Sequence, residues 1–336
     1  MTFLPRQDVP RWQRNHVGRR RIRVLRVSAG VLLMLSVWWL SHDYAMTLLR
    51  STTLEDEAII EISPVSMSLI PPRIWQIMFP KAGSSDPITP DQLGDTASWL
   101  ALNPDFSYTL IGPKGANDLI LEAFPEQPQV VKVFEDLPNV AMKSDLLRYG
   151  VLHTHGGVYT DTDTVAIRGV DQWIPADIRD QVRLVVGIEY DRRDDRPWPG
   201  IFHWVQFCQW TIAAAPGHPV FEGMIARALR SIMELANQGE RAFVDLHLST
   251  LEVMNSTGPA AWTEIVFEHL QAFDPSLNTT ADLSYMEEPT LFGDILVLPI
   301  DGFGMGQQHS HSSNDGSVPS AALARHLFRG SWKDDW

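Results

Sequence analysis

The chain has 336 residues, of which 44% are hydrophobic and 20% are charged, the composition of a globular protein with a sizeable core. Residues 1–26 carry eight arginines and one acid, which leaves 19 basic and 40 acidic side chains in residues 27–336, a net charge of −21. An acidic main body argues against nucleic acid as a partner, and the single Cys208 excludes an internal disulfide.

The N-terminal region has the pattern of a membrane anchor. Arginines precede an apolar segment of about 17 residues that ends in Trp38, Trp39 and Leu40, and no Ala-x-Ala cleavage site follows it. Basic residues stay on the cytosolic side of a membrane. We therefore expect a cytosolic basic tail (1–23), a single transmembrane signal anchor (24–41), a stem (42–69) and a lumenal folded domain (70–336). The alternative is a buried core helix behind a disordered tail.

The expected topology is single-pass type II, with the main body in the lumen. A short span suits thin membranes, so the membrane of the Golgi or of the endoplasmic reticulum is the expected location. Asn255 and Asn278 both begin Asn-x-Thr sequons, and a lumenal body would make either a candidate for glycosylation.

Strands and helices alternate from residue 70 onward. The hydrophobic pattern predicts a buried strand at Ile74–Phe79, a helix at 91–102, a strand at Phe106–Ile111 and a short helix at 117–124. This alternation indicates an α/β fold with a mainly parallel central sheet. In such sheets, ligands bind beyond the carboxyl ends of the strands.

A helix predicted at Val140–Leu152 carries Asp145 and Arg148, which are three residues apart and share one face. They form either an ordinary surface ion pair or a pair that points into a cleft. In a cleft, Asp145 would accept hydrogen bonds from sugar hydroxyls and Arg148 would bind a phosphate or hydroxyl. Gly156 and Gly157 then permit a turn with positive φ.

Asp161 and Asp163 follow the short strand that begins at Val158. Residues two apart on an ideal strand face the same side, so both carboxylates are expected to reach one site. Two adjacent carboxylates repel unless a cation or a proton lies between them, and oxygen ligands suit Mg²⁺ or Mn²⁺. A lone Asp-x-Asp is also common in solvated turns, so the surrounding motif matters.

The remaining pattern completes the α/β interpretation. It predicts two further strands and a helix, a solvated charged loop, a buried thiol at Cys208 and a surface role for His309 and His311. The segments are, in order, the strand at 182–188, the loop at 191–196, the helix at 220–235 and the strand at 295–300.

The motif Ser-Asp-x-x-Arg-Tyr (144–149) followed by Gly-Gly-x-Tyr-x-Asp-x-Asp (156–163) resembles the signature of glycosyltransferase family 32, the family of the fungal initiating α-1,6-mannosyltransferases. It is also similar to the sugar-transferring domains of large bacterial toxins. Three other segments resemble the family as well: Ile-Pro-Pro-Arg-Ile-Trp-Gln (70–76), Thr-Gly-Pro (257–259) and the C-terminal His-x-x-x-Gly-Ser-Trp (326–332).

The resemblance implies a membrane-anchored, metal-dependent hexosyltransferase with a GT-A-type nucleotide-sugar-binding fold that retains anomeric configuration. It implies Mn²⁺ or Mg²⁺ bound by Asp161, Asp163 and His326, with Asp145 and Arg148 acting on the sugar and the phosphate. The further nucleotide-sugar contacts that we expect are Trp75, Gln76, Tyr159, Thr162, Ser331 and Lys333. GDP-mannose is the expected donor, and an N-glycan or an inositol-phosphate sphingolipid is the expected acceptor. For Trp75 and His326, a purely structural role is the alternative.

Two other functions fit parts of the sequence. Asp161-Thr-Asp-Thr-Val matches the Asp-x-Asp-x-Thr-Val motif of haloacid-dehalogenase-type phosphatases, in which Asp161 would be the nucleophile and Asp163 the acid/base. That motif normally follows a hydrophobic strand, whereas Gly156 and Gly157 precede it here. A non-catalytic lumenal protein that kept the fold is the other alternative, and the intact Asp pair and late His326 disfavour it.

Overall fold

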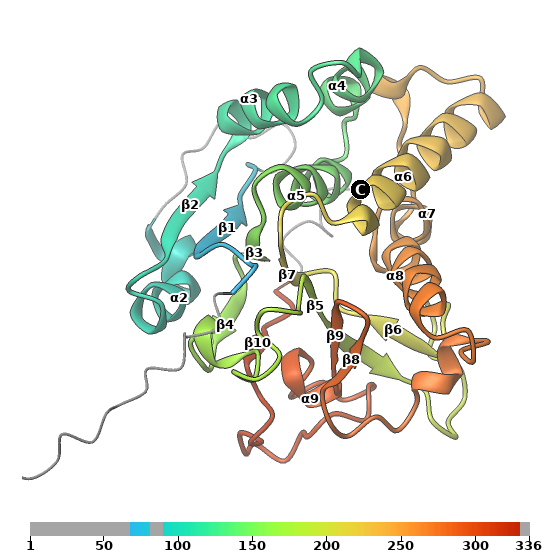
Figure 1. Cartoon of the computed structure of the whole chain (residues 1–336). Coiled ribbons are helices and arrows are strands. Elements are labelled where there is room, and N and C mark those ends of the chain that lie inside the picture. The colour runs from blue at the N-terminus through green and yellow to red at the C-terminus, as the bar shows by residue number, and fades with distance from the viewer. Residues whose placement is uncertain (1–67, 81–89, 330–336) are drawn as a thin grey trace, which may run out of the picture. The chain divides into compact units, whose positions relative to one another are not determined.

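The computed structural model describes residues 68–80 and 90–329, all of which belong to one compact unit, Val65–Trp336 (Figure 1). The expected basic tail and membrane anchor, nearly all of the stem, and the candidate residues Ser331 and Lys333 lie outside the described residues. Among the helices that the structure does describe, none combines the length and apolarity that a membrane crossing needs.

The elements alternate in type along the first half of this unit. In order they are β1 (Arg73–Ile77), a 3-10 helix η1 (Pro90–Thr96), α2 (Ala97–Leu102), β2 (Ser107–Ile111), α3 (Pro113–Ala123), α4 (Pro128–Asp136), α5 (Val140–His155), β3 (Gly157–Thr160), β4 (Thr164–Ala166) and η2 (Val170–Gln172).

The second half contains the remaining strands of the sheet and the long helices that cover it. In order they are β5 (Leu184–Asp191), β6 (Val205–Phe207), β7 (Thr211–Ala214), α6 (Pro219–Gln238), η3 (Phe243–Asp245), α7 (Thr250–Ser256), α8 (Pro259–Phe273), η4 (Thr280–Leu283), β8 (Thr290–Phe292), β9 (Ile295–Leu298), α9 (Ile300–Phe303) and β10 (Ala324–His326).

The α/β class is confirmed, and the central sheet is mixed. Its eight strands follow the order β2-β1-β3-β7-β5-β9-β8, with β6 paired to β5. The pairs β1–β2, β1–β3 and β5–β9 are parallel, while β7 is antiparallel to both β3 and β5. Most strands therefore run in one direction, but the sheet is not parallel throughout, because β7 returns directly beside β3.

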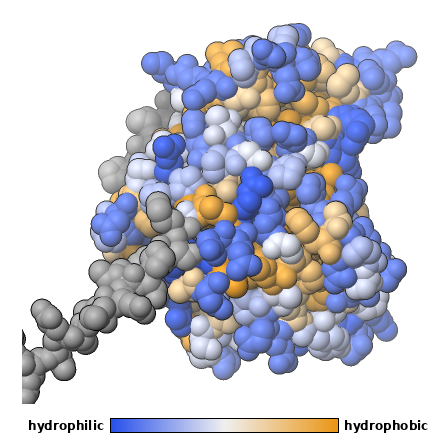
Figure 2. Space-filling model, in the orientation of Figure 1, coloured by the Kyte–Doolittle hydropathy of each residue, from blue (hydrophilic) through white to orange (hydrophobic). Residues whose placement is uncertain are grey.

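The strands separate two hydrophobic clusters, one on each face of the sheet. On β5, Leu184 and Val186 face the helices α3, α5, α6 and α8, whereas Val185 faces the other cluster, which contains Trp99 and Phe303. This alternation follows from the two-residue period of a strand, and burial on both faces explains why β5 and β9 are nearly all apolar. Cys208 is buried and free, as predicted. On the face that Figure 2 shows, hydrophobic and hydrophilic residues are intermixed.

Two predicted segments differ from the structure. The helix expected at 91–102 is a 3-10 helix up to Thr96 and becomes α-helical only at Ala97. The loop expected to be solvated from residue 191 onward begins with a buried side chain, since β5 extends to Asp191 and this residue is 3% exposed. Asp191 accepts hydrogen bonds from the Ser284 hydroxyl and from the backbone N–H of Tyr285 at 2.8 Å, which compensate for the loss of water.

The predicted glycine turn is confirmed and positions the candidate site. Asn139 caps α5 by accepting hydrogen bonds from the first backbone amides of the helix. At the other end, Gly156 and Gly157 have φ values of 62° and 101°. A Cβ on Gly156 would lie 2.7 Å from the backbone nitrogen of Pro216, so this position requires glycine for space as well as for its backbone angle. The turn leads directly into β3, between β1 and β7.

Candidate active site

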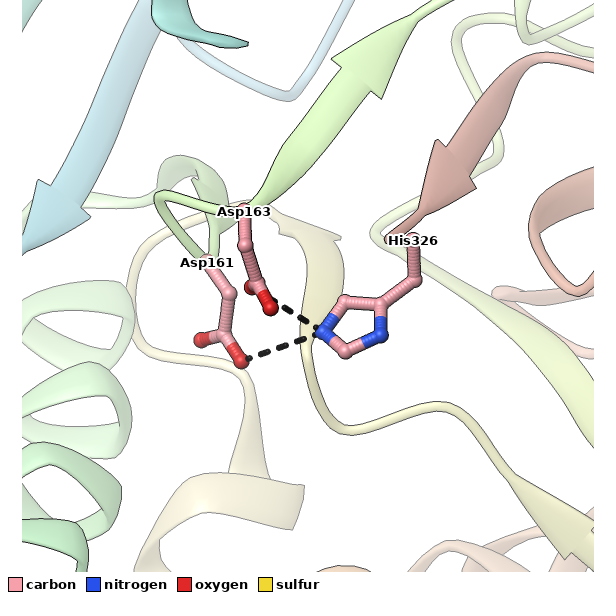
Figure 3. A group of neighbouring side chains, drawn as sticks. All are labelled: Asp161, Asp163 and His326. Carbon is pink, nitrogen blue, oxygen red and sulfur yellow. Dashed lines mark ion pairs between the residues drawn. The ribbon is translucent and has the colours of Figure 1, made fainter. Parts of the chain in front are cut away.

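Two acids from the middle of the chain and a histidine from near its C-terminus meet at one point (Figure 3). Asp161 and Asp163 lie between β3 and β4, and His326 lies on β10, which pairs antiparallel with β4. His326 Nε2 is 3.1 Å from Asp163 Oδ1 and 3.8 Å from Asp161 Oδ2. One ligand atom from each residue lies within 4.8 Å of the others, so the predicted cluster of these three residues is present.

The two acids share a site for a different reason from the one expected from strand alternation. They do not belong to a strand, because residues 161–163 form a turn. The Thr164 hydroxyl closes this turn by donating a hydrogen bond to the backbone oxygen of Asp161 at 2.6 Å. Asp163 is also held by the C-terminal segment, since its backbone oxygen accepts from Leu327 N and its Oδ2 accepts from Arg329 N, both at 2.9 Å.

His326 is oriented by its neighbours. Its Nδ1 accepts a hydrogen bond from the backbone N–H of Phe328 at 3.2 Å, so Nε2 faces the acids. The Trp210 ring lies 4.8 Å from the imidazole, centroid to centroid. Burial lowers the pKa of His326, but the hydrogen bonds and charges of Asp161 and Asp163 outweigh burial and raise it to about 9. The two acids thus favour the protonated, positively charged form of the imidazole.

Behind Asp161 lies the Asp145–Arg148 pair of α5, which is buried and is not a surface ion pair. Each residue is 5% exposed, and Arg148 NH2 is 3.0 Å from Asp145 Oδ1. Arg148 NH1 is 3.5 Å from Asp161 Oδ1, and the guanidinium lies 4.5 Å from the centre of the Tyr159 ring. Burial raises the pKa of Asp161, but the Arg148 charge and His326 outweigh it, and the net pKa is lowered.

Asp145 belongs to a buried network that reaches α7. Thr257 Oγ1 donates to Asp145 Oδ2 at 2.7 Å, and Gln209 Nε2 donates both to the Tyr149 hydroxyl and to the Thr257 backbone oxygen. Burial raises the pKa of Asp145 to about 6, although Arg148 and Thr257 oppose the rise. The Thr-Gly-Pro turn therefore contacts the site through the Thr257 side chain. A sugar contact of Asp145 and a phosphate contact of Arg148 stay predictions.

Of the expected nucleotide contacts, Trp75 and Gln76 are buried. The Trp75 indole N–H donates to the backbone oxygen of Gly156 at 2.8 Å. Gln76 Nε2 donates to the backbone oxygen of Asp161 at 3.0 Å, and its Oε1 accepts from the Thr96 and Tyr108 hydroxyls. Trp75 thus stabilises the glycine turn and Gln76 stabilises the backbone at Asp161, and their contact with a nucleotide stays a prediction.

Tyr159 and Thr162, the other two described candidates, lie beside the acids. The Tyr159 hydroxyl donates to Asp161 Oδ1 and so orients that carboxylate together with Arg148. Thr162 stands between the acids in the turn and is half-buried.

Glu189 is a nearby acid that the sequence interpretation missed. Its Oε1 accepts a hydrogen bond from Trp210 Nε1, and its Oε2 accepts one from Gln206 Nε2, both at 3.2 Å. Burial raises the pKa of Glu189. The sequence could have indicated Glu189, because it is the one acid within the otherwise apolar run 184–190. An acid on a buried strand needs a structural or chemical reason.

The cluster fits a divalent cation. Carboxylate oxygens suit Mg²⁺ and Mn²⁺, and an imidazole nitrogen favours Mn²⁺ over Mg²⁺. The side chains of Asp161, Asp163 and His326 are 29%, 17% and 11% exposed, so part of the site faces solvent. Ligands from water or phosphate can therefore complete the coordination of an ion held by these three side chains.

Comparison with known proteins gives matches across the described unit. Residues 90–179 match the family described as the glycosyltransferase sugar-binding region containing a DXD motif. The initiation-specific alpha-1,6-mannosyltransferase of Schizosaccharomyces pombe is 33% identical over 314 residues, covering 87% of this chain and 73% of the relative. The enzyme of the same name from Candida albicans is 33% identical over 290 residues, covering 79% of this chain and 72% of the relative.

Among solved structures, the PaToxG glycosyltransferase aligns with a TM-score of 0.41 and 18% identity, over 62% of this chain and 72% of that chain. The resemblance read from the motifs is thus matched by sequence identity that extends over most of two fungal enzymes.

Proposed function

This chain belongs to glycosyltransferase family 32, the family of the fungal initiation-specific alpha-1,6-mannosyltransferases, and from this premise we propose that it is a metal-dependent hexosyltransferase of the GT-A type. It transfers a hexose from a nucleotide sugar to a glycan or glycolipid acceptor, with retention of anomeric configuration. The observation that carries the proposal is the convergence of Asp161, Asp163 and His326 on one partly exposed point.

Asp161, Asp163 and His326 are the residues that would hold the divalent cation. Mn²⁺ is the expected ion, and Mg²⁺ is the alternative. When bound, the cation stabilises the negative charge that develops on the departing diphosphate. The protein supplies the geometry. Arg148 and Tyr159 fix one oxygen of Asp161. The C-terminal segment fixes Asp163 through Arg329 N.

The donor that we propose is GDP-mannose, because the two fungal relatives are named as mannosyltransferases. The expected contacts of Trp75, Gln76, Thr162, Ser331 and Lys333 with the donor belong to this proposal. The acceptor is a mannose-containing N-glycan, with an inositol-phosphate sphingolipid as the second choice. The family assignment leaves the phosphatase and non-catalytic alternatives without support.

The proposal includes the cellular setting. The basic tail and the apolar segment at 24–41 anchor the chain in a Golgi or endoplasmic reticulum membrane, with residues 70–336 in the lumen. Carbonate extraction of membranes tests the anchor, and release of the full-length protein into the soluble fraction contradicts it.

The activity is tested by a ligand screen and a transfer assay on the full-length protein in detergent. Nucleotide sugars are compared by thermal shift with Mn²⁺ present, since a bound ligand raises apparent stability by mass action. We expect GDP-mannose to raise the melting temperature most, and to donate labelled mannose to a high-mannose N-glycan. Absence of binding and of hydrolysis for every nucleotide sugar tested contradicts the proposal.

A further inference from the structure

The carboxylate of Glu189 lies on the β5 and β6 side of the metal-binding cluster, and the mechanism above does not use it. Its oxygens accept hydrogen bonds from Trp210 Nε1 and Gln206 Nε2. No ion pair with Glu189 is formed by the residues of the described ranges, unlike Asp145 and Asp161, which have Arg148. A carboxylate offers about four acceptor positions. Glu189 therefore retains acceptor capacity that the protein does not fill.

Trp210 connects Glu189 to the cluster. Its ring lies 4.8 Å from the His326 ring, its backbone oxygen accepts from Asp161 N at 2.9 Å, and its indole N–H points to Glu189. Glu189 is partly exposed, as are Asp161 and His326. The carboxylate is thus partly exposed, like the residues of the metal-binding cluster, and is linked to His326 through Trp210.

A second acceptor beside Glu189 also lacks a donor. Gln206 is 1% exposed, its Nε2 is bonded to Glu189, and its Oε1 is buried with no hydrogen-bond partner. Unpaired buried acceptors are uncommon in folded proteins. The protein thus leaves acceptors at and beside Glu189 without donors, and the hydroxyl groups of a hexose can donate to the partly exposed Glu189 carboxylate.

We infer that Glu189 accepts a hydrogen bond from a hydroxyl of a hexose bound beside the metal site. This inference rests on the proposed function, because it assumes that hexoses occupy the site. The hexose is either the one being transferred or the terminal residue of the acceptor. Both present the same hydroxyl chemistry to the carboxylate, and donor hydrolysis distinguishes them, because hydrolysis uses water in place of the acceptor.

Glu189→Gln is a mild test variant. The new amide oxygen can still accept from Trp210 Nε1, and its NH₂ can donate to Gln206 Oε1 once the Gln206 amide rotates, so residue 189 keeps a hydrogen bond to each of these two neighbours. The variant also removes a charge from a half-buried position. Its melting temperature should therefore be no lower than that of the wild type. Asp191→Asn is the control, because it makes the same change at the end of the same strand, where the carboxylate binds Ser284, Tyr285 and Arg193.

The experiment measures three quantities for the full-length protein: mannose transfer from GDP-mannose to a high-mannose glycan, hydrolysis of GDP-mannose without acceptor, and the Kd of GDP with Mn²⁺ present. Loss of a hydrogen bond to a charged group lowers transfer by about 10- to 100-fold. We expect this loss in Glu189→Gln with an unchanged Kd for GDP, and no loss in Asp191→Asn. Unchanged hydrolysis assigns the contact to the acceptor, and hydrolysis that falls in parallel assigns it to the transferred hexose.

A structural role makes different predictions. If Glu189 only holds Trp210 against His326, then Trp210→Phe, which keeps a ring and loses the N–H donor, should reduce transfer and raise the Kd for GDP with Mn²⁺. Glu189→Gln, which still accepts from Trp210 Nε1, should then transfer mannose as fast as the wild type, and that result overturns the inference. A loss of transfer in Glu189→Gln that comes with a raised Kd for GDP overturns it as well. A wild type that neither transfers nor hydrolyses any hexose contradicts the proposed function and this inference together.

Discussion

His326 Nε2 lies 3.1 Å from Asp163 Oδ1, although the two residues come from opposite halves of the chain. The antiparallel pairing of β4 with β10, in which His326 is opposite Thr164, brings them together. Two carboxylates and an imidazole at this distance hold a proton when no cation is bound, which is why the pKa of His326 rises to about 9. A metal that binds here must displace that proton.

The first prediction is that Mn²⁺ binding strengthens with pH. Below a pKa of about 9, each bound ion displaces about one proton from His326, so the Kd should fall by up to about tenfold per pH unit between pH 6.5 and 8. Isothermal titration at several pH values, in buffers of different ionisation enthalpy, measures the Kd and the protons released. In His326→Ala the binding should be weaker and its pH slope smaller, and a slope equal to that of the wild type contradicts the assignment of His326.

The raised pKa of His326 also predicts how the stability of the metal-free protein changes with pH. A histidine whose pKa is raised in the folded state stabilises the protein fully below its unfolded pKa of about 6.5, and this contribution disappears as pH rises through about 9. The melting temperature in a chelator should therefore decline between pH 6.5 and 9 more steeply for the wild type than for His326→Ala. Parallel curves would show that the imidazole gains no charge from the two acids.

Another prediction concerns the contribution of Arg148 to the free energy of unfolding. Arg148→Met leaves the buried Asp145 without its cation, and removal of one partner of a buried ion pair costs about 3–5 kcal/mol in the free energy of unfolding. Arg183→Met is the matched control, because Arg183 pairs with Asp294 at 3.6 Å with its side chain 37% exposed, where a pair contributes about 1 kcal/mol or less. Urea denaturation measures both. Equal losses in the two variants would mean that the Arg148 network does not stabilise the fold.

A further prediction separates two reasons why residue 156 is a glycine, its backbone angle and the lack of space for a Cβ. Gly156 and Gly217 have similar φ values, 62° and 67°, but a Cβ would meet backbone atoms of Pro216 and Ala214 within 2.8 Å at Gly156 and nothing within 4 Å at Gly217. Gly217→Ala should therefore cost about 1–2 kcal/mol for the left-handed backbone alone. Gly156→Ala should cost more and should also reduce hexose transfer, because β3 and Asp161 follow it. Similar losses in stability would remove the argument for close backbone approach.

Much of this fold was predictable from the hydrophobic pattern and the glycine positions of the sequence. The periodicity of Val140–Leu152 predicted α5, and the glycine pair predicted the turn after it. The apolar runs predicted the positions of β5 and β9, because strands buried on both faces are apolar throughout. The strands predicted at 74–79 and 106–111 correspond to β1 and to the edge strand β2. The approach of His326 to Asp161 and Asp163 was predictable only with the help of the family resemblance, since nothing near His326 in the sequence indicates that β10 pairs with β4.

Long-range contacts account for what the sequence did not reveal. The helical pattern does not show that Asp145 meets Thr257, or that Gln76 supports Asp161, because these pairs depend on how distant elements pack. Asp191 was expected to be solvated because the residues after it are charged, yet Ser284 and Tyr285 cover it. Asp161 and Asp163 were expected to face one site because they were placed on a strand. In the structure they lie in a hydrogen-bonded turn, and the turn brings both carboxylates to the site.

The account depends on a divalent cation held by Asp161, Asp163 and His326, and Mn²⁺ binding itself tests it most directly. Electron paramagnetic resonance of free Mn²⁺, titrated into the full-length protein with GDP present, counts bound ions. We expect about one tightly bound ion per wild-type chain, and binding weaker by at least about 100-fold in Asp161→Asn/Asp163→Asn, since two of the three protein ligands lose their charge and direct-ligand losses exceed those of outer-shell partners. Circular dichroism should show that the variant is folded. Equal Mn²⁺ binding by the folded variant and the wild type would contradict the central claim.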